Sequence, residues 1–101
     1  MVAEVMGASE IGQRLSELDG WVLANGAITR TVEMRGFPDA ITLVDRVAVV
    51  AEELDHHPDM DIRWRTVTFS CVTHSAGGVT ARDFRLATRI DEIIKGFTGG
   101  N

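Results

Sequence analysis

The segment 36–58 constrains the fold most, because it is a long apolar helical pattern with a start and a stop signal. Gly36-Phe37-Pro38-Asp39 places a proline and an acid where a helix begins. Asp55-His56-His57-Pro58 stops the helix, since proline disfavours helical geometry in the residue before it. Two apolar stripes run along it, Leu43, Val47, Val50 and Leu54, and Ile41, Val44, Ala48 and Ala51. One stripe can cover a sheet, and we expect the second to contact the same helix of another subunit; neighbouring helices of one chain are the alternative.

The remaining segments predict an antiparallel sheet and two further helices. Asn25-Gly26 joins strands at 21–24 and 27–34 in a hairpin, because both residues tolerate positive φ. Segment 62–73 is one strand, or two short strands separated by a bulge near Arg65. A helix capped by Ser9 covers 9–18, and Thr80-Ala81-Arg82-Asp83 has capping-box spacing before a last helix that reaches Phe97. The fold class is therefore α+β, with order α-β-β-α-β-β-α: an antiparallel sheet of about four strands with three helices packed on one face.

Length and composition indicate one domain, 1–101, with flexible tails at 1–8 and 98–101. A net charge of −5 argues against direct nucleic-acid contact and against binding to an anionic membrane. Four charged side chains interrupt the longest apolar stretch, 41–54, so we expect no membrane span. The single cysteine, Cys71, cannot form an internal disulfide, and no basic-then-apolar leader opens the chain. We expect a cytoplasmic protein.

The candidate chemistry lies in the three histidines His56, His57 and His74. Histidine is the side chain whose ordinary pKa lies near neutrality, so rings gathered around one substrate can both donate and accept protons. Glu52 and Glu53 precede His56 and His57 by four residues, which predicts a carboxylate one turn beneath each ring. In the alternative, structural reading, the His-His-Pro run only ends a helix.

These residues resemble the signature of the pterin-4a-carbinolamine dehydratases. The signature has an acid, His-His-Pro after three positions, an aromatic after five or six, a histidine after nine, and an aspartate after eight or more. The matching positions are Glu52, His56-His57-Pro58, Trp64, His74 and Asp83. Gly20-Trp21, Glu52-Glu53-Leu54-Asp55, Thr73-His74 and Ala81-Arg82-Asp83-Phe84 extend the resemblance, which covers about 9–95.

The resemblance implies dehydration of 4a-hydroxytetrahydropterin to quinonoid dihydropterin, without metal or organic cofactor, in tetrahydrobiopterin-type recycling. It implies that His56 and His74 act as general acids on the C4a hydroxyl, and that His57 binds the pterin and helps to remove the N5 proton.

The resemblance also assigns supporting roles on the substrate side of the site. Glu52 and Asp55 orient the rings, while Arg82 and Asp83 position the loop that closes the pocket. For Asp83, a helix cap alone is the alternative role. Trp64, a predicted substrate-binding residue, and Trp21 are expected in the core or in the pocket wall, with specific stacking on the ligand as the alternative.

Two features depart from the family pattern or lack a role. Met60 stands where many relatives have an aromatic, which loosens that wall of the pocket. Arg63 and Arg65 flank Trp64 and have no assigned role beyond a solvated or intersubunit strand face.

Other functions stay open at this point. The three histidines with Asp55 or Glu52 could hold zinc, although adjacent rings diverge on regular backbone. A non-catalytic binding, assembly or transcription-cofactor protein could use the same fold and oligomer surface. We expect a homodimer or homotetramer formed through the central helix and a sheet edge. The sequence leaves open which pterin is used and whether an aromatic amino acid hydroxylase is served.

Overall fold

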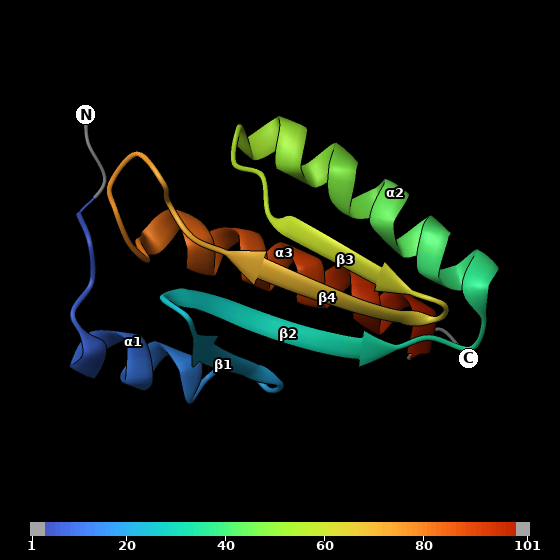
Figure 1. Cartoon of the computed structure of the whole chain (residues 1–101), viewed down its shortest axis with the longest axis horizontal. Helices are drawn as coiled ribbons and strands as arrows, with labels where there is room; N and C mark the ends of the chain where they lie inside the picture. Colours follow the sequence, from blue (N-terminus) through green and yellow to red (C-terminus); the bar gives the residue numbers. More distant parts are fainter. Residues whose placement is uncertain (1–3, 99–101) are drawn as a thin grey trace.

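The computed structural model describes residues 4–98, and its elements follow the predicted order. They are α1 (Ala8–Leu15), β1 (Trp21–Ala24), β2 (Ala27–Glu33), α2 (Phe37–Leu54), β3 (Asp59–Arg63), β4 (Thr66–Cys71) and α3 (Ala81–Thr98). The strands form one antiparallel sheet in the order β1-β2-β4-β3 (Figure 1). The α+β class and the element order are therefore confirmed.

The core lies between one face of this sheet and the helices. In β4, Val67, Phe69 and Cys71 are fully buried, while the alternating threonines and serine are only half-buried. This is the period-2 pattern of a strand with one covered face. From the helices, Leu43 and Val47 of α2, Leu86 and Ile90 of α3 and Ile11 of α1 join the same cluster. The opposite face carries the cross-strand pairs Thr31–Thr68 and Thr29–Ser70.

Two hairpins build the sheet, and the sequence contains a recognisable turn signal for only one of them. Asn25 and Gly26 both have positive φ, as predicted for a two-residue turn. The second hairpin joins β3 to β4 at Trp64 and Arg65, so the two-strand alternative holds but the bulge near Arg65 is wrong. Trp64 adopts φ 55°, a conformation that bulky residues rarely take, and this is why the sequence contained no turn signal there.

Helix α2 begins after Gly36 and ends at Leu54, as the start and stop signals predicted. Its first stripe is buried at Leu43, Val47 and Val50. The second stripe is divided: Ala51 is 2% exposed within the chain, whereas Ile41, Val44 and Ala48 are exposed or half-buried. The fold of one chain therefore leaves most of the second stripe uncovered.

The amino-terminal region differs from the prediction in two ways. Gly7, not Ser9, is the N-cap of α1, and Ser9 lies inside the first turn. The segment 1–8 was expected to be a loose arm, yet the Met6 N–H donates to the Val79 carbonyl at 2.8 Å and the Met6 side chain is buried. Its described part therefore packs on the loop before α3 (Figure 1). At the other end, Thr98 is the last residue of α3, and the rest of both predicted tails lies outside the described residues.

Within residues 4–98, none of the helices has the length and apolar character needed to cross a membrane.

Candidate active site

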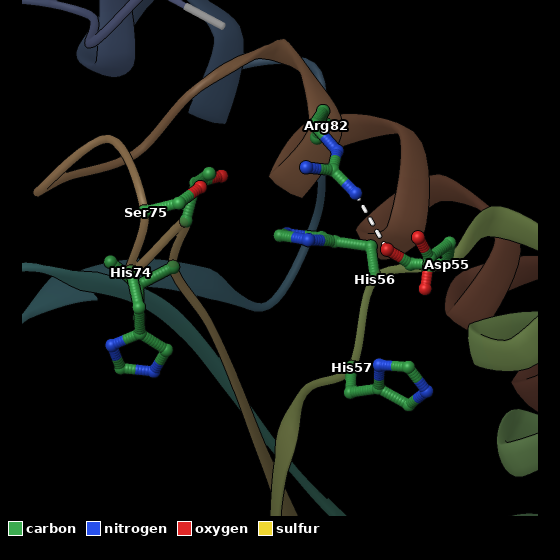
Figure 2. A pocket seen from close by; sticks show the side chains of 8 residues that line it. Asp55, His56, His57, His74, Ser75 and Arg82 are labelled. Carbon is green, nitrogen blue, oxygen red and sulfur yellow. Dashed lines mark hydrogen bonds between the residues drawn. The ribbon is translucent and has the colours of Figure 1, made fainter. Parts of the chain in front are cut away.

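The three histidines line one cavity of about 230 Å³, where the end of α2, the end of β4 and the start of α3 meet (Figure 2). Its lining consists of Asp55, His56, His57, Val72, Thr73, His74, Ser75 and Arg82. Five of the eight predicted site residues are in this set. The pocket is thus assembled from segments that are far apart in the sequence, as the resemblance implied.

The backbone conformation of Asp55 determines the directions of the two histidine side chains that follow it. Asp55 has the left-handed conformation, with φ 50° and ψ 45°, and so ends α2. The His56 N–H donates to the Ala51 carbonyl at 3.0 Å, which closes the last turn. The Arg82 guanidinium donates to the Asp55 carbonyl at 2.6 Å and ties this turn to α3 (Figure 2). Beyond this point the two rings turn to opposite sides in the view of Figure 2.

His56 is the buried histidine of the site, and Asp83 holds it. Its Nε2 lies 2.6 Å from Asp83 Oδ1, and Asp83 is fully buried. The other carboxylate oxygen accepts from the Thr73 hydroxyl and from the Thr80 N–H, each at 2.8 Å. Both oxygens of this buried carboxylate are therefore held by hydrogen bonds, which fixes the ring that it contacts.

The network around Asp83 is also the capping box that the sequence predicted. The Asp83 carboxylate accepts the Thr80 N–H, and the Thr80 hydroxyl oxygen accepts the Arg82 N–H at 3.2 Å. The Thr73 and Thr80 hydroxyls lie 2.7 Å apart, so β4's end is bonded to α3's start. The sequence analysis treated a helix cap and a site role as alternatives for Asp83. In the structure the same carboxylate accepts the Thr80 N–H of the cap and contacts His56 in the pocket.

His57 and the two glutamates do not follow the predicted spacing. His57 Nε2 lies 2.5 Å from the Glu52 carboxylate, five residues earlier, and both side chains are more than half exposed. Glu53 pairs instead with Arg89 of α3 at 3.2 Å. The expected pairs of Glu52 with His56 and of Glu53 with His57 are wrong, because the helix ends at Leu54 and the left-handed Asp55 rotates the following side chains.

His74 reaches the pocket from a tight loop after β4. The Thr73 N–H donates to the Gly78 carbonyl at 3.1 Å, and Gly77 has φ 83°. His74 is exposed, and among residues 4–98 no side chain hydrogen-bonds its ring. Its ring nitrogens are thus available to a substrate.

Trp64 is the predicted site residue that the fold places elsewhere in its chain. It lies at the β3–β4 turn, at the opposite end of β3 from His57, and its side chain is 70% exposed. Six residues, 58–63, lie between the two, and β3 makes up five of them, so the separation is roughly 20 Å at the usual rise. Trp64 therefore does not line the pocket of its own chain.

Trp21 belongs to the core, where it meets a charge pair that the sequence analysis missed. Asp91 of α3 accepts from the Trp21 indole N–H at 2.8 Å and from Arg30 at 2.6 Å. A cavity of about 510 Å³ lies beside this pair, larger than the histidine pocket. We assign the chemistry to the smaller cavity, because it gathers ring nitrogens that are free to react, whereas Arg30 and Asp91 already neutralise one another.

Two other chemistries find less support in the geometry. Among residues 4–98, no three His, Cys, Asp or Glu side chains are arranged to hold a metal ion, and His56 and His57 contact different carboxylates. Burial, with smaller contributions from the charges of Asp83 and Asp59, raises the pKa of the Cys71 thiol. Cys71 is therefore a protonated core residue and no nucleophile.

Thr73 and Thr80 are the functional neighbours that sequence reasoning did not single out as site residues. Both are buried, and both orient Asp83. Two signals were available in the sequence: Thr80 is the capping-box threonine, and Thr73 is adjacent to His74. Their role became visible only when β4 and α3 were placed side by side.

Comparisons with known proteins identify the family of the chain. The family profile described as Pterin 4 alpha carbinolamine dehydratase matches residues 4–93. A Nocardia farcinica protein provisionally named pterin-4-alpha-carbinolamine dehydratase is 52% identical over 94% of this chain and 100% of its own length. A relative from Roseiflexus castenholzii with the same provisional name is 50% identical over 92% of this chain and 100% of its own length.

Solved structures show the same fold. The transcriptional coactivator/pterin dehydratase from Brucella melitensis superposes with a TM-score of 0.86 at 34% identity, over 89% of this chain and 98% of that one. A pterin dehydratase-like protein identified as a RuBisCO assembly factor in the alpha-carboxysome superposes with a TM-score of 0.59 at 15% identity, over 72% and 84%. At that identity the likeness shows the fold alone. The profile match and the close relatives together show that this chain belongs to the pterin-4a-carbinolamine dehydratase family.

Proposed function

We propose that this protein dehydrates 4a-hydroxytetrahydropterin to quinonoid dihydropterin and water. In this step the C4a hydroxyl takes up a proton and leaves as water, N5 loses its proton, and a double bond forms between N5 and C4a. No electrons enter or leave, so the reaction needs only an acid and a base on the two sides of the bond. The observation that carries the proposal is the gathering of all three histidines on one pocket.

His56 is proposed as a general acid because Asp83 binds one of its ring nitrogens and the other nitrogen remains for the substrate. The Asp83 carboxylate accepts from an Nε2–H, which leaves Nδ1 as the nitrogen that exchanges a proton with substrate. His74, on the other side of the pocket, is the second proposed acid. With rings on two elements, the site can protonate the hydroxyl of either stereoisomer at C4a.

His57 is proposed to bind the pterin and to help to remove the N5 proton. Glu52 contacts its Nε2, and this contact orients the ring on a mostly exposed surface. Asp55 and Arg82 are proposed to hold the entrance, because the Arg82 bond to the Asp55 carbonyl fixes the turn that carries both rings. Asp83 acts through His56 and is a positioning residue.

A stopped-flow assay tests the proposal by following carbinolamine decay with and without protein. The His56→Ala/His74→Ala double variant should lose at least about 10²-fold of the accelerated rate, since general acids typically contribute 10² to 10⁴. Gln13→Ala, an exposed polar change on α1, is the matched control and should leave the rate unchanged. Unchanged acceleration in the double variant would overturn the assignment.

His57→Ala separates binding from proton transfer. Its main effect should be a higher KM, because the proposed contact is with bound pterin. Circular dichroism of each variant shows whether the fold survives. A loss of kcat with an unchanged KM would remove the binding role from His57.

We also propose that the protein works as a cytoplasmic homo-oligomer, joined through α2 and an edge of the sheet, in tetrahydrobiopterin-type recycling. The uncovered part of the second stripe, Ile41, Val44 and Ala48, supports the helix contact. Sedimentation at micromolar concentration measures the assembly. Direct contact with nucleic acid or membrane is not part of the proposal.

A partner-binding role is the second candidate, favoured by the same exposed apolar residues of α2. The Brucella melitensis protein is named both as a transcriptional coactivator and as a pterin dehydratase. A protein partner captured equally well by the triple variant His56→Ala/His57→Ala/His74→Ala would support a role that needs no catalysis. Loss of capture in that variant would argue against it.

A further inference from the structure

Two buried threonine hydroxyls support the contact between Asp83 and His56. The Thr73 hydroxyl donates to Asp83 Oδ2 at 2.8 Å, and the hydroxyl oxygens of Thr73 and Thr80 lie 2.7 Å apart. Both threonine residues are at most 2% exposed. These two hydroxyls, which we call the threonine pair, bind the carboxylate through the oxygen that the His56 ring does not contact.

The number of available protons determines the direction of the bonds in the threonine pair. A hydroxyl has one proton to donate, and Thr73 uses its proton on Asp83. Thr80 is therefore the donor in the contact between the two hydroxyls, and its oxygen accepts the Arg82 N–H at 3.2 Å. In the opposite direction, the proton of the buried Thr80 hydroxyl would have no acceptor within residues 4–98. All bonds of the threonine pair thus point toward Asp83, and each strengthens the next.

The direction of these bonds decides where the proton between Asp83 and His56 rests. Nε2 of the ring and Oδ1 of the carboxylate lie 2.6 Å apart, and the proton between them can rest on either atom. The other oxygen, Oδ2, accepts two bonds, from the Thr73 hydroxyl and from the Thr80 N–H. Asp83 also lies in the first turn of α3, where the helix dipole favours negative charge. These contacts stabilise the ionised carboxylate, so the proton rests on Nε2.

The position of this shared proton sets the strength of His56 as an acid. When it rests on Nε2, a second proton on Nδ1 makes the ring an imidazolium, which gives the Nδ1 proton to a substrate readily. When it rests on Asp83, the same two protons leave a neutral imidazole beside a neutral carboxyl group. A neutral imidazole is a much weaker acid, so the pair then holds its protons without using them.

We propose that Thr73 is a positioning residue, which together with Thr80 keeps the shared proton on Nε2 of His56. The transfer of the Nδ1 proton to the leaving hydroxyl rests on the proposed function. The position of the proton in the free protein does not, and it is measured without any pterin.

Nitrogen-15 NMR of the free protein tests the position of the shared proton. The chemical shift of each ring nitrogen distinguishes a protonated from an unprotonated nitrogen, and the spectrum of His56→Ala identifies the two signals. We expect Nε2 to be protonated in the unaltered protein, both above and below the pH at which Nδ1 titrates. In Thr73→Val, which keeps the shape of the side chain without its hydroxyl, Nε2 should lose part of this character. An unprotonated Nε2 in the unaltered protein would overturn the proposal.

Two further variants separate the hydroxyl from the fold around it. Thr73→Ser keeps the hydroxyl and should restore the Nε2 signal. Thr68→Val is the matched control, because it removes a hydroxyl from β4 whose partner is Thr31 on the open face of the sheet, at 2.9 Å. It should leave the His56 signals unchanged. Equal changes in Thr73→Val and Thr68→Val, or no rescue by Thr73→Ser, would reduce Thr73 to a structural residue.

Kinetics test the consequence for the reaction. Thr73→Val should lower kcat roughly 10- to 100-fold, the effect of one hydrogen bond to a charged group, and leave KM nearly unchanged. Its less stabilised carboxylate lets the pair of Asp83 and His56 hold protons more tightly, so the pH–rate curve should move toward higher pH. A loss of stability alone would not move this curve. A lower kcat with an unmoved curve would therefore refute the positioning role.

The outcomes for the proton and for the reaction are distinguishable. The spectrum of the unaltered protein needs no variant, so it tests the position of the proton even where Thr73→Val does not fold, which circular dichroism shows. Thr80→Val should then move the Nε2 signal in the same direction by a smaller amount, because Thr80 reaches the carboxylate with its hydroxyl only through Thr73. An unmoved signal in Thr80→Val would contradict the direction of the bonds. If the unaltered protein has no dehydratase activity, the proposed function fails, and the spectra still decide the role of Thr73.

Discussion

Replacing Asp83 with asparagine separates the bond that orients His56 from the bonds that cap α3. An asparagine oxygen can still accept from the Thr73 hydroxyl and the Thr80 N–H, so the helix cap survives. The asparagine NH₂ then faces His56 Nε2, where a carboxylate oxygen lay at 2.6 Å. Because two donors cannot share a bond, His56 must present Nε2 as an acceptor and carry its proton on Nδ1.

The magnitudes follow from these contacts. Hydrogen bonds to a charged group contribute about 1.5–3 kcal/mol, and asparagine keeps two neutral bonds in place, so we expect a loss of about 2 kcal/mol in the free energy of unfolding. For a domain of this size that lowers Tm by on the order of 10 °C. In the unaltered protein His56 can be the doubly protonated ring, which donates from Nε2 to Asp83 and from Nδ1 to the substrate. The asparagine NH₂ excludes a proton from Nε2 and leaves a neutral ring, which is a poorer acid, so the rate should fall by about 10² to 10⁴.

The assay compares melting temperature, kcat and the pH dependence of dehydration for Asp83→Asn. Asp39→Asn is the matched control, because Asp39 is a half-buried carboxylate in the first turn of α2 and does not line the pocket. We expect Asp39→Asn to change stability alone, and Asp83→Asn to change the shape of the pH–rate curve as well. A lowered Tm with an unchanged pH–rate curve would reduce Asp83 to a helix cap and refute the tautomer argument.

Three further variants or reagents probe parts of the fold outside the pocket. Asp91→Ala leaves the buried Trp21 indole N–H and the half-buried Arg30 guanidinium without their acceptor. It should lower the free energy of unfolding in urea by about 2–4 kcal/mol and leave kcat unchanged. A loss no larger than that of the exposed Glu92→Ala would contradict this. Burial raises the pKa of the Cys71 thiol, so this thiol should react with iodoacetamide on the order of 10³-fold more slowly in the folded than in the urea-unfolded protein. Mass spectrometry measures both rates, and similar rates would show that the core is open to the reagent. Ala48→Glu should give folded monomers, since the site is exposed in one chain but an unpaired carboxylate in an interface costs several kcal/mol; sedimentation showing a stable monomer for the unaltered protein at micromolar concentration would reject the interface.

The elements and the identity of the chemical groups could be read from local patterns. The helix 37–54 follows from apolar periodicity with a proline near each end, and the first hairpin follows from Asn25-Gly26. These signals act over a few residues, so they can be recognised without knowledge of the tertiary structure. The histidine spacing likewise predicted one site, and in the structure the three histidines line one pocket.

The partners of those groups depended on tertiary structure. The sequence by itself predicted that the helix stops at the Asp55-His56-His57-Pro58 segment, and it predicted glutamates one turn beneath the two rings. The left-handed Asp55 broke that spacing, and Asp83, 27 residues later, became the partner of His56 once α3 packed beside the end of α2. A turn at Trp64 and a buried Asp91 were equally invisible, because φ at a bulky residue and the pairing of a charge are decided by distant neighbours. Local propensity determines where elements begin and end, whereas only packing decides which side chains face each other across them.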